Sequence, residues 1–227
     1  MDAVDDAYYV GAGLKRSSPI DYANTKYNKR GLFAWEQQMM DDHFTPGSAL
    51  ALLAAGGGRE VLALRQQSFD VQAWECQPEL VEAANSLLVA EGFEPTVSFA
   101  PRNTVPAGPA QFDGFIIGWG AYTLIPGRDR RVALLQAART RVTAGSPLLV
   151  SFFNRRPGNV YDRIVAGFGN LWRRLLRRER LEVGESLEPN LVRAFVEEEI
   201  RSELAAGGFR MTYFSTTPYG HAVAVAD

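Results

Sequence analysis

Cysteine, histidine and lysine are scarce in this sequence of 227 residues. It has one cysteine (Cys76), two histidines and three lysines, against 21 arginines. A single cysteine excludes an internal disulfide and a multi-cysteine metal site, and it is typical of a reducing compartment, so we expect a cytoplasmic protein. Neither His43 nor His221 stands near carboxylates at metal-ligand spacing, so we expect no metal site.

Long apolar runs and an excess of one charge are also missing. No uninterrupted apolar stretch approaches the ~18 residues that a membrane span needs, and the acidic N-terminus MDAVDDAYYVG does not resemble a secretory signal. The formal net charge of −2 argues against nucleic acid as a partner, because such proteins carry a basic surface. A hydrophobic share of 46% and a charged share of 22% are ordinary for a globular protein.

The most informative stretch is LALLAAGGGREVLAL, residues 50–64. An apolar run enters the triple glycine 56–58 and is followed by a helix-like run. A second apolar run, FDVQAWE, then ends at Glu75. Glycines let a backbone approach a ligand at a helix N-terminus, and an acid at the tip of the next strand accepts hydrogen bonds from ribose hydroxyls. The stretch therefore predicts a nucleotide-type cofactor site.

Hydrophobic periodicity predicts that strands and helices alternate along most of the chain. We expect strands at 49–54, 71–75, 95–100, 112–120 and 147–153, and helices at 27–44, 59–67, 78–92 and 127–145. A helix over 190–208 and two strands at 209–217 and 221–227 follow. This order predicts an α/β fold with a parallel sheet and helices on both faces. The closing hairpin makes the last strand antiparallel.

We expect one domain with four segments. These are an N-terminal arm or lid with a helix (1–46), a cofactor-binding core (47–153), an arginine-rich insertion (154–190), and the last helix with the closing hairpin (191–227). The insertion admits three interpretations: a solvated or internally neutralised helix, an anion-recognising wall of a substrate pocket, or a helix that contacts anionic lipid through 164–180. The first is favoured, because the segment 182–203 is acidic enough to neutralise it.

This order of elements resembles the class I S-adenosylmethionine-dependent methyltransferases. The resemblance rests on the AAGGGRE turn, Glu75, the strands FDGFIIGWGAY and PLLVSF, and the ending EEEIRSELAAGGF…PYGHAVA, and it covers roughly residues 27–227. It implies a Rossmann-like, seven-stranded, mostly parallel sheet with an antiparallel last strand. It also implies S-adenosylmethionine as the cofactor and methyl transfer to an oxygen or nitrogen of a small molecule or modified peptide.

The resemblance also implies roles for individual residues in cofactor binding. Glu75 would bind the ribose hydroxyls, and Asn103 falls near where many members place an aspartate beside the adenine amine. Gly118 and Trp119 would flank the transferable methyl group. The implied cofactor-binding set is Tyr27, Ala54, Gly56, Gly58, Glu75, Asn103, Gly118 and Trp119.

Three positions depart from the family pattern. Ala54 replaces the first glycine of the loop, which an alanine tolerates if φ is negative. Leu52 stands where an acid often anchors the amino group of the cofactor, and Asn103 replaces an aspartate. These departures motivate an alternative, a non-catalytic partner protein of the same fold. A nicotinamide-binding domain fits less well, because its fingerprint needs a glycine where this chain has Val61.

The acceptor side is less well defined by the sequence. His221 opens the last strand at the ligand edge, where it either deprotonates an acceptor or serves as a hydrogen-bonded turn histidine. The predicted catalytic residues are His221 and Tyr122, and the predicted acceptor-binding residues are Arg155, Arg156, Arg163 and Tyr219. A second alternative is a peripheral membrane methyltransferase that acts on a lipid head group. The sequence indicates no oligomeric state.

Overall fold

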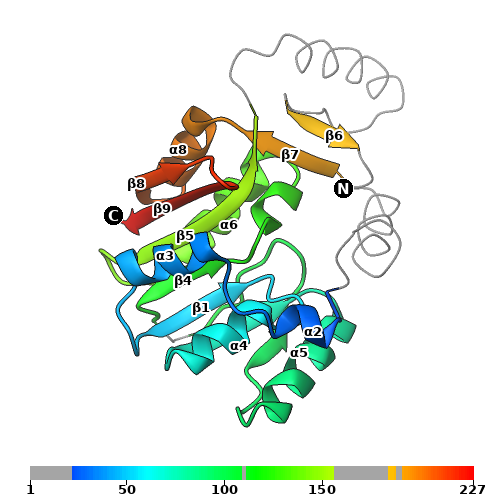
Figure 1. Ribbon diagram of the computed structural model, residues 1–227. Coiled ribbons are helices and arrows are strands. Elements are labelled where there is room, and N and C mark those ends of the chain that lie inside the picture. Colours follow the sequence, from blue (N-terminus) through cyan, green and yellow to red (C-terminus); the bar gives the residue numbers. More distant parts are fainter. Residues whose placement is uncertain (1–21, 109–110, 156–183, 188–190) are drawn as a thin grey trace.

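The computed structural model describes residues 22–108, 111–155, 184–187 and 191–227, and their strands form one mixed sheet (Figure 1). The strands are β1 (Ala49–Leu53), β2 (Asp70–Glu75), β3 (Val97–Phe99), β4 (Gly114–Ile117), β5 (Pro147–Asn154), β6 (Glu185–Leu187), β7 (Leu191–Phe195), β8 (Phe209–Ser215) and β9 (Gly220–Ala226). The helices are α2 (Thr25–Asn28), α3 (Ala34–His43), α4 (Arg59–Gln66), α5 (Pro78–Ala90), the 3-10 turn η2 (Ala121–Leu124), α6 (Arg128–Arg139) and α8 (Glu197–Ala206).

The predicted fold class is confirmed. Strands β3, β2, β1, β4 and β5 lie side by side in that order, and all are parallel. Strand β9 pairs antiparallel with both β5 and β8, which gives the expected closing hairpin. Because the parallel strands all end at the same edge, the loops after β1, β2 and β4 meet there.

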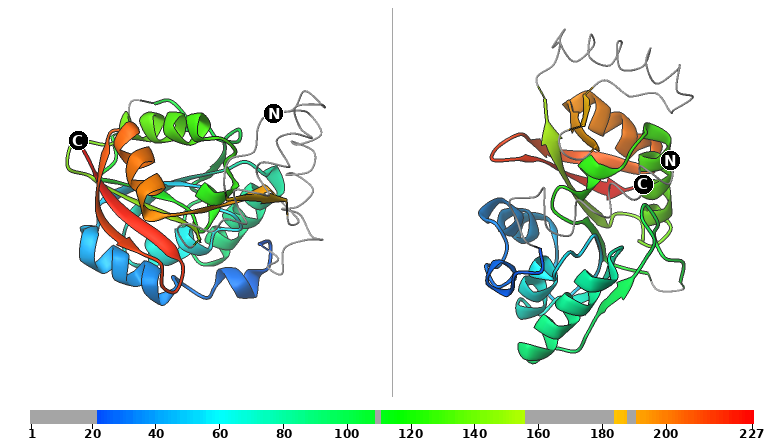
Figure 2. Two further views of the ribbon diagram at one scale, coloured as in Figure 1. Left: turned by 90° about the horizontal axis from the view of Figure 1, so that it is seen from above. Right: turned by 90° about the vertical axis from the view of Figure 1, so that its right-hand side faces the viewer.

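Helices cover both faces of the sheet (Figure 2). Buried side chains of α3, α4 and α5 pack on one face with Leu50 and Leu52 of β1. Buried side chains of α6 and α8 pack on the other face with Ala51 and Leu53. The alternation of these four residues between two apolar cores is what a strand buried on both faces requires.

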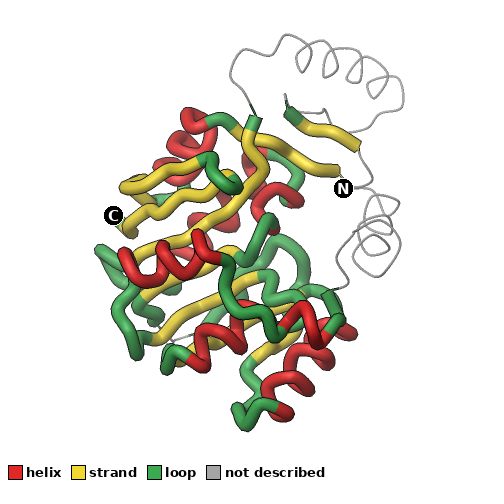
Figure 3. The backbone as a smooth tube through the Cα atoms, in the orientation of Figure 1, coloured by secondary structure: helices red, strands yellow, loops and turns green. Residues whose placement is uncertain are grey.

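The short hairpin of β6 and β7 is an addition to the seven expected strands. The first six residues of β5 pair with β9, whereas its last two, Phe153 and Asn154, pair with β7. The sheet therefore divides at this point, as the tube in Figure 3 shows. The prediction of one helix over 190–208 is wrong, because Leu191–Phe195 is strand β7. The helix begins only at Glu197, where Val196 N–H donates to the Glu199 carboxylate at 3.1 Å.

The predicted helix over 27–44 is also interrupted. Helix α2 ends at Asn28 and α3 begins at Ala34, with Gly31 between them at φ 79°. That left-handed conformation does not belong to an α-helix. No helix in the described ranges is long and apolar enough to cross a membrane. The segment 164–180, Arg156 and Arg163 lie outside the described residues.

Candidate functional site

The glycine turn links the end of β1 to the start of α4. Gly56 and Gly58 have φ values of 53° and 93°, in the region that favours glycine. A side chain on Gly58 would place its Cβ 3.0 Å from the Cβ of Ala84 on α5. The condition under which alanine is tolerated at position 54, a negative φ, is not met, because the φ of Ala54 is 61°. The chain thus keeps a glycine-type backbone at Ala54, at a cost of about 1–2 kcal/mol for an L-residue.

Glu75 ties this turn to the end of β2. The side chain is 5% exposed. Its Oε2 accepts a hydrogen bond from the Gly56 N–H at 2.8 Å. Its Oε1 accepts from the Cys76 and Gln77 N–H groups at 2.8 and 3.1 Å. The orientation of the carboxylate is therefore set by the backbone, and Oε2, with one bond, keeps capacity for a ligand hydroxyl.

The loop after β3 begins beside Glu75. The Ala100 N–H donates to the Glu75 carbonyl at 3.0 Å, and Asn103 follows three residues later, half-buried and with φ 55°. Burial, and then the charge of Glu75, raises the pKa of the Cys76 thiol to about 11, with Arg102 opposing. Cys76 is therefore not an activated thiolate at neutral pH.

Gly118 and Trp119 follow the end of β4, next to the glycine turn. A Cβ on Gly118 would lie 2.5 Å from the carbonyl oxygen of Ala54, so only glycine lets these two backbones come together. The Trp119 N–H donates to Oε1 of Glu60 at 2.9 Å. Its ring meets the rings of Phe33 and Tyr219 edge to face, with centroids 6.0 and 5.6 Å apart.

The N-terminal residues of the described chain cover the turn. A Cβ on Gly57 would lie 1.9 Å from the carbonyl oxygen of Tyr22 and 2.3 Å from Nδ2 of Asn28. Tyr27 lies in the same segment, and burial raises the pKa of its phenol. Between this cover and the turn is a hollow, the turn hollow, of ≈ 290 Å³ including open solvent. It is lined by Tyr22, Tyr27, Asn28, Ala54, Ala55, Gly56, Gly57, Arg59, Glu60 and Trp119.

A buried cluster of charges at the start of α4 was not predicted from the sequence. Nη1 and Nη2 of Arg59 lie 2.6 and 2.7 Å from the two carboxylate oxygens of Glu36 on α3. Nη2 also lies 3.3 Å from Oε1 of Glu60. Burial, with the charge of Glu36, raises the pKa of Glu60 to about 7, although Arg59 and the Trp119 N–H oppose the shift. The one available signal was the pair Arg59-Glu60 directly after the glycines.

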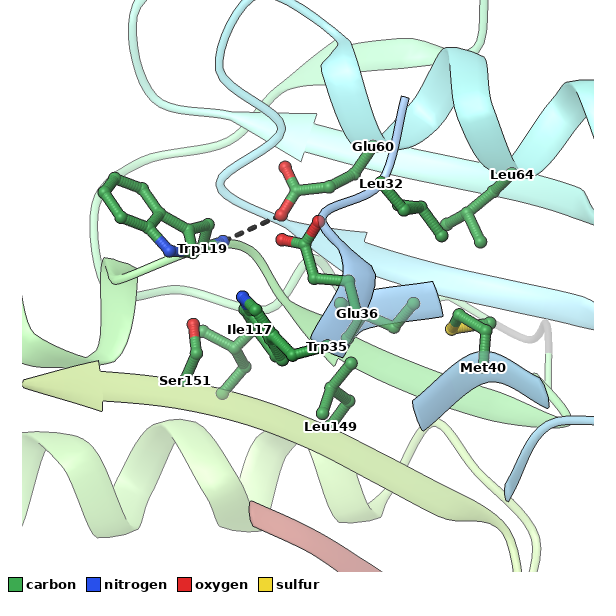
Figure 4. Close-up of a pocket in the computed structure, with 11 residues that line it drawn as sticks. Leu32, Trp35, Glu36, Met40, Glu60, Leu64, Ile117, Trp119, Leu149 and Ser151 are labelled. Carbon is green, nitrogen blue, oxygen red and sulfur yellow. Dashed lines mark hydrogen bonds between the residues drawn. The ribbon is translucent and has the colours of Figure 1, made fainter. Parts of the chain in front are cut away.

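A second hollow, the α3 hollow, adjoins the first and shares Glu60 and Trp119 with it (Figure 4). Figure 4 shows the carboxylates of Glu36 and Glu60 pointing toward each other above Trp35. The other walls are Leu32, Met40, Leu64, Ile116, Ile117, Leu149 and Ser151. Nε1 of Trp35 is buried and has no hydrogen-bond partner among the described residues. The lining is thus apolar and aromatic, with a few polar groups.

His221 lies on the same face of the sheet, opposite Ser151 in the β5–β9 ladder. It is 2% exposed, and its ring packs between Trp35 and Tyr213. Its Nδ1 lies 2.9 Å from the carbonyl oxygen of Tyr219. Because a carbonyl oxygen only accepts, Nδ1 carries the proton and Nε2 keeps its lone pair.

Four of the predicted residues line the two hollows: Tyr27, Ala54, Gly56 and Trp119. The others that the structure describes line neither of them: Gly58, Glu75, Asn103, Gly118, Tyr122, Arg155, Tyr219 and His221. Tyr122 is 1% exposed in the core on the opposite face, and its hydroxyl donates to Glu203 at 2.7 Å. In this structure its side chain therefore lies in the core and lines neither hollow. Arg155 donates to Glu199 at 2.8 Å and to the Ala194 carbonyl at 3.2 Å, and so joins β5 to β7 and α8.

Comparison with solved structures finds the same fold in proteins of low sequence identity. An S-adenosylmethionine-dependent methyltransferase from Methanosarcina mazei has a TM-score of 0.62 and 14% identity, over 86% of this chain and 98% of that one. Magnesium protoporphyrin IX methyltransferase from Synechocystis, with S-adenosylhomocysteine bound, has a TM-score of 0.57 and 15% identity, over 99% and 95%. An amino pentose methyltransferase from Micromonospora echinaspora, with S-adenosylmethionine bound, has a TM-score of 0.57 and 17% identity, over 100% and 98%.

No protein-family model matches the sequence, and a search of curated proteins finds no match. The likeness to solved structures is therefore one of fold. On that basis the chain has the Rossmann-like α/β fold of the class I S-adenosylmethionine-dependent methyltransferases.

Proposed function

We propose that this protein binds S-adenosylmethionine and transfers its methyl group to an oxygen or nitrogen of a small molecule or modified peptide. The observation that carries the proposal is the hydrogen bond from the Gly56 N–H to the Glu75 carboxylate. It brings the glycine turn and the acid at the tip of β2 together at the carboxyl edge of a parallel sheet. That is where a nucleotide-type ligand binds in such folds.

The residues at this edge fit the cofactor. Glu75 would offer Oε2 to the ribose hydroxyls beside Gly56, and the lining of the turn hollow includes Gly56 and Trp119. When bound, S-adenosylmethionine supplies an electrophilic methyl carbon on a positively charged sulfur. Arg59 faces two buried carboxylates, so with both ionised the cluster carries an excess negative charge that favours a cation. The protein then mainly has to align the acceptor with the methyl carbon.

The α3 hollow is the proposed acceptor side. Its apolar and aromatic walls match a small organic acceptor in kind, and Trp35 and Ser151 supply polar groups that could orient one. The enclosed space has room for about one water, so binding an acceptor requires the walls to move. His221 is the proposed base: its ring contacts Trp35 in the wall of this hollow, its Nε2 has a lone pair, and burial lowers the pKa of the imidazole, which keeps it neutral at pH 7. Tyr219 holds the ring through its carbonyl oxygen.

The first experiment is a calorimetric titration with S-adenosylhomocysteine, with NADH as the control ligand. We expect micromolar binding of the first and none of the second. Glu75→Gln should weaken binding at least tenfold, since a charge-assisted hydrogen bond is worth about 1.5–3 kcal/mol. The matched control is Glu79→Gln, an exposed acid in the first turn of α5, which should bind as the wild type does.

Other outcomes separate the alternatives. Wild-type affinity in Glu75→Gln would contradict the placement of the ribose. Binding without turnover of any acceptor, with activity only in a complex, would favour a non-catalytic partner protein. That protein is the alternative suggested by the strained Ala54. Once an acceptor is known, His221→Gln should lose turnover but still bind S-adenosylhomocysteine, and an unchanged rate would exclude His221 as the base.

A further inference from the structure

The turn hollow contains a buried hydrogen-bond acceptor that faces no donor. Asn28 is 2% exposed, and its Oδ1 has no hydrogen-bond partner among the described residues. The orientation of the amide is set, because Nδ2 donates to the Tyr22 carbonyl at 2.8 Å. A buried acceptor left unpaired costs free energy. The hollow therefore suits a ligand that brings N–H donors.

Glu60 lines the same hollow and presents a second acceptor. Its contacts within the described part of the chain both use Oε1, which accepts from the Trp119 N–H at 2.9 Å and lies 3.3 Å from Nη2 of Arg59. Oε2 makes neither contact. Figure 4 shows this carboxylate at the start of α4, between Trp119 and Glu36. A ligand donor at Oε2 would complete its hydrogen bonding.

The charge around Glu60 favours a cation. Arg59 is engaged by both oxygens of Glu36, so one guanidinium faces two carboxylates. All three side chains are buried: Arg59 is 4% exposed, Glu36 is 5% exposed and Glu60 is 10% exposed. With both carboxylates ionised the cluster has one excess negative charge, which burial makes unfavourable, and a positive group beside Glu60 removes that excess. An ammonium group brings one positive charge and three N–H donors.

Leu52 leaves the usual anchor of the amino group of the cofactor without a carboxylate. It is fully buried in the core of β1, at a position where the resemblance implies an acid that anchors the amino group of the cofactor. We propose that Glu60 and Asn28 bind the ammonium group of the amino-acid part of the cofactor, in place of the acid absent at Leu52. This inference rests on the proposed function and names the residues that hold one part of the same ligand.

The test compares two ligands that differ in this part. S-adenosylhomocysteine carries the ammonium group, whereas 5′-methylthioadenosine has the same nucleoside and sulfur without it. Both are titrated calorimetrically into the wild type, Glu60→Gln and the control Glu79→Gln. We expect Glu60→Gln to bind S-adenosylhomocysteine at least tenfold more weakly, as for loss of a charge-assisted hydrogen bond. Its affinity for 5′-methylthioadenosine should stay as in the wild type, which also shows that the variant is folded.

Each other outcome overturns the inference in a distinguishable way. Unchanged affinity of Glu60→Gln for both ligands would mean that Glu60 does not contact the ammonium group, and the proposed cofactor would stand. An equal loss for both ligands would mean that Glu60 acts through the fold of the turn. Failure of the wild type to bind either ligand would overturn the proposed function, and the inference with it.

Discussion

His221 and Trp35 lie ring against ring, with centroids 4.6 Å apart and planes inclined by 34°. Burial lowers the pKa of His221, and the hydrogen bond to the Tyr219 carbonyl opposes the shift in part. Because His43 and His221 are the only histidines, a nuclear magnetic resonance titration of His43→Gln reports on His221 alone. We expect a midpoint below the ordinary 6.5. A midpoint at or above that value would contradict the burial of this ring.

The lowered pKa of His221 also predicts how the free energy of unfolding depends on pH. The folded pKa of His221 lies below the unfolded value, so the unfolded chain takes up the proton first as the pH falls. We therefore expect this group to reduce the free energy of unfolding as the pH drops below 6.5. The decrease should be smaller in His221→Phe than in the wild type when urea unfolding is followed between pH 7.5 and 5. An equal decrease in both proteins would contradict a lowered pKa of His221 in the folded state.

Glu60 should produce the opposite dependence. Burial and the charges of Glu36 and Glu75 raise its pKa to about 7 from 4.5, against Arg59 and the Trp119 N–H. The folded chain then holds the extra proton between these values, so stability from this group is lost as the pH rises through that window. Glutamine carries no charge. We therefore compare the melting temperature of Glu60→Gln with that of the wild type at each pH. The variant should gain relative to the wild type at pH 8 compared with pH 5, and a relative gain at pH 5 instead would contradict the raised pKa of Glu60.

Gly57→Ala should displace the cover over the turn. Its Cβ would lie 1.9 Å from the Tyr22 carbonyl oxygen and 2.3 Å from Nδ2 of Asn28, and overpacking of this kind costs about 1–3 kcal/mol. We expect faster hydrogen exchange in residues 22–28. The control is Gly108→Ala, whose Cβ meets only the flexible end of Arg141, at 3.2 Å. Identical exchange in both variants would show that the cover does not depend on Gly57.

Tyr122→Phe separates packing from catalysis. The hydroxyl donates to Oε2 of Glu203, and Arg131 contacts both oxygens of that carboxylate at 2.8 and 2.9 Å. Loss of the tyrosine donor should lower the free energy of unfolding by about 1–3 kcal/mol. Affinity for S-adenosylhomocysteine should not change. Tyr219→Phe, at an exposed position, is the control for stability. If Tyr122→Phe bound S-adenosylhomocysteine more weakly with an unchanged free energy of unfolding, Tyr122 would belong to the binding site.

Much of the site could be predicted because it depends on short local patterns. The triple glycine after an apolar run, and Glu75 at the end of the next one, place both groups at one edge once the strands are parallel. The helix boundaries were harder. Residues 191–195 form a strand because β5 and β6 supply pairing partners, and a helix-like sequence has no local signal for that.

The sequence by itself determined the order of strands and helices over residues 47–153 and the closing hairpin, and hence the edge of the sheet where the loops with Gly56, Glu75 and Trp119 meet. The tertiary structure alone decided which charged groups pair: Arg59 with Glu36, 23 positions apart, and Arg155 with Glu199, 44 positions apart. Periodicity reports which face of an element is buried. It does not report which distant element lies against that face, and a buried charge takes its partner from there.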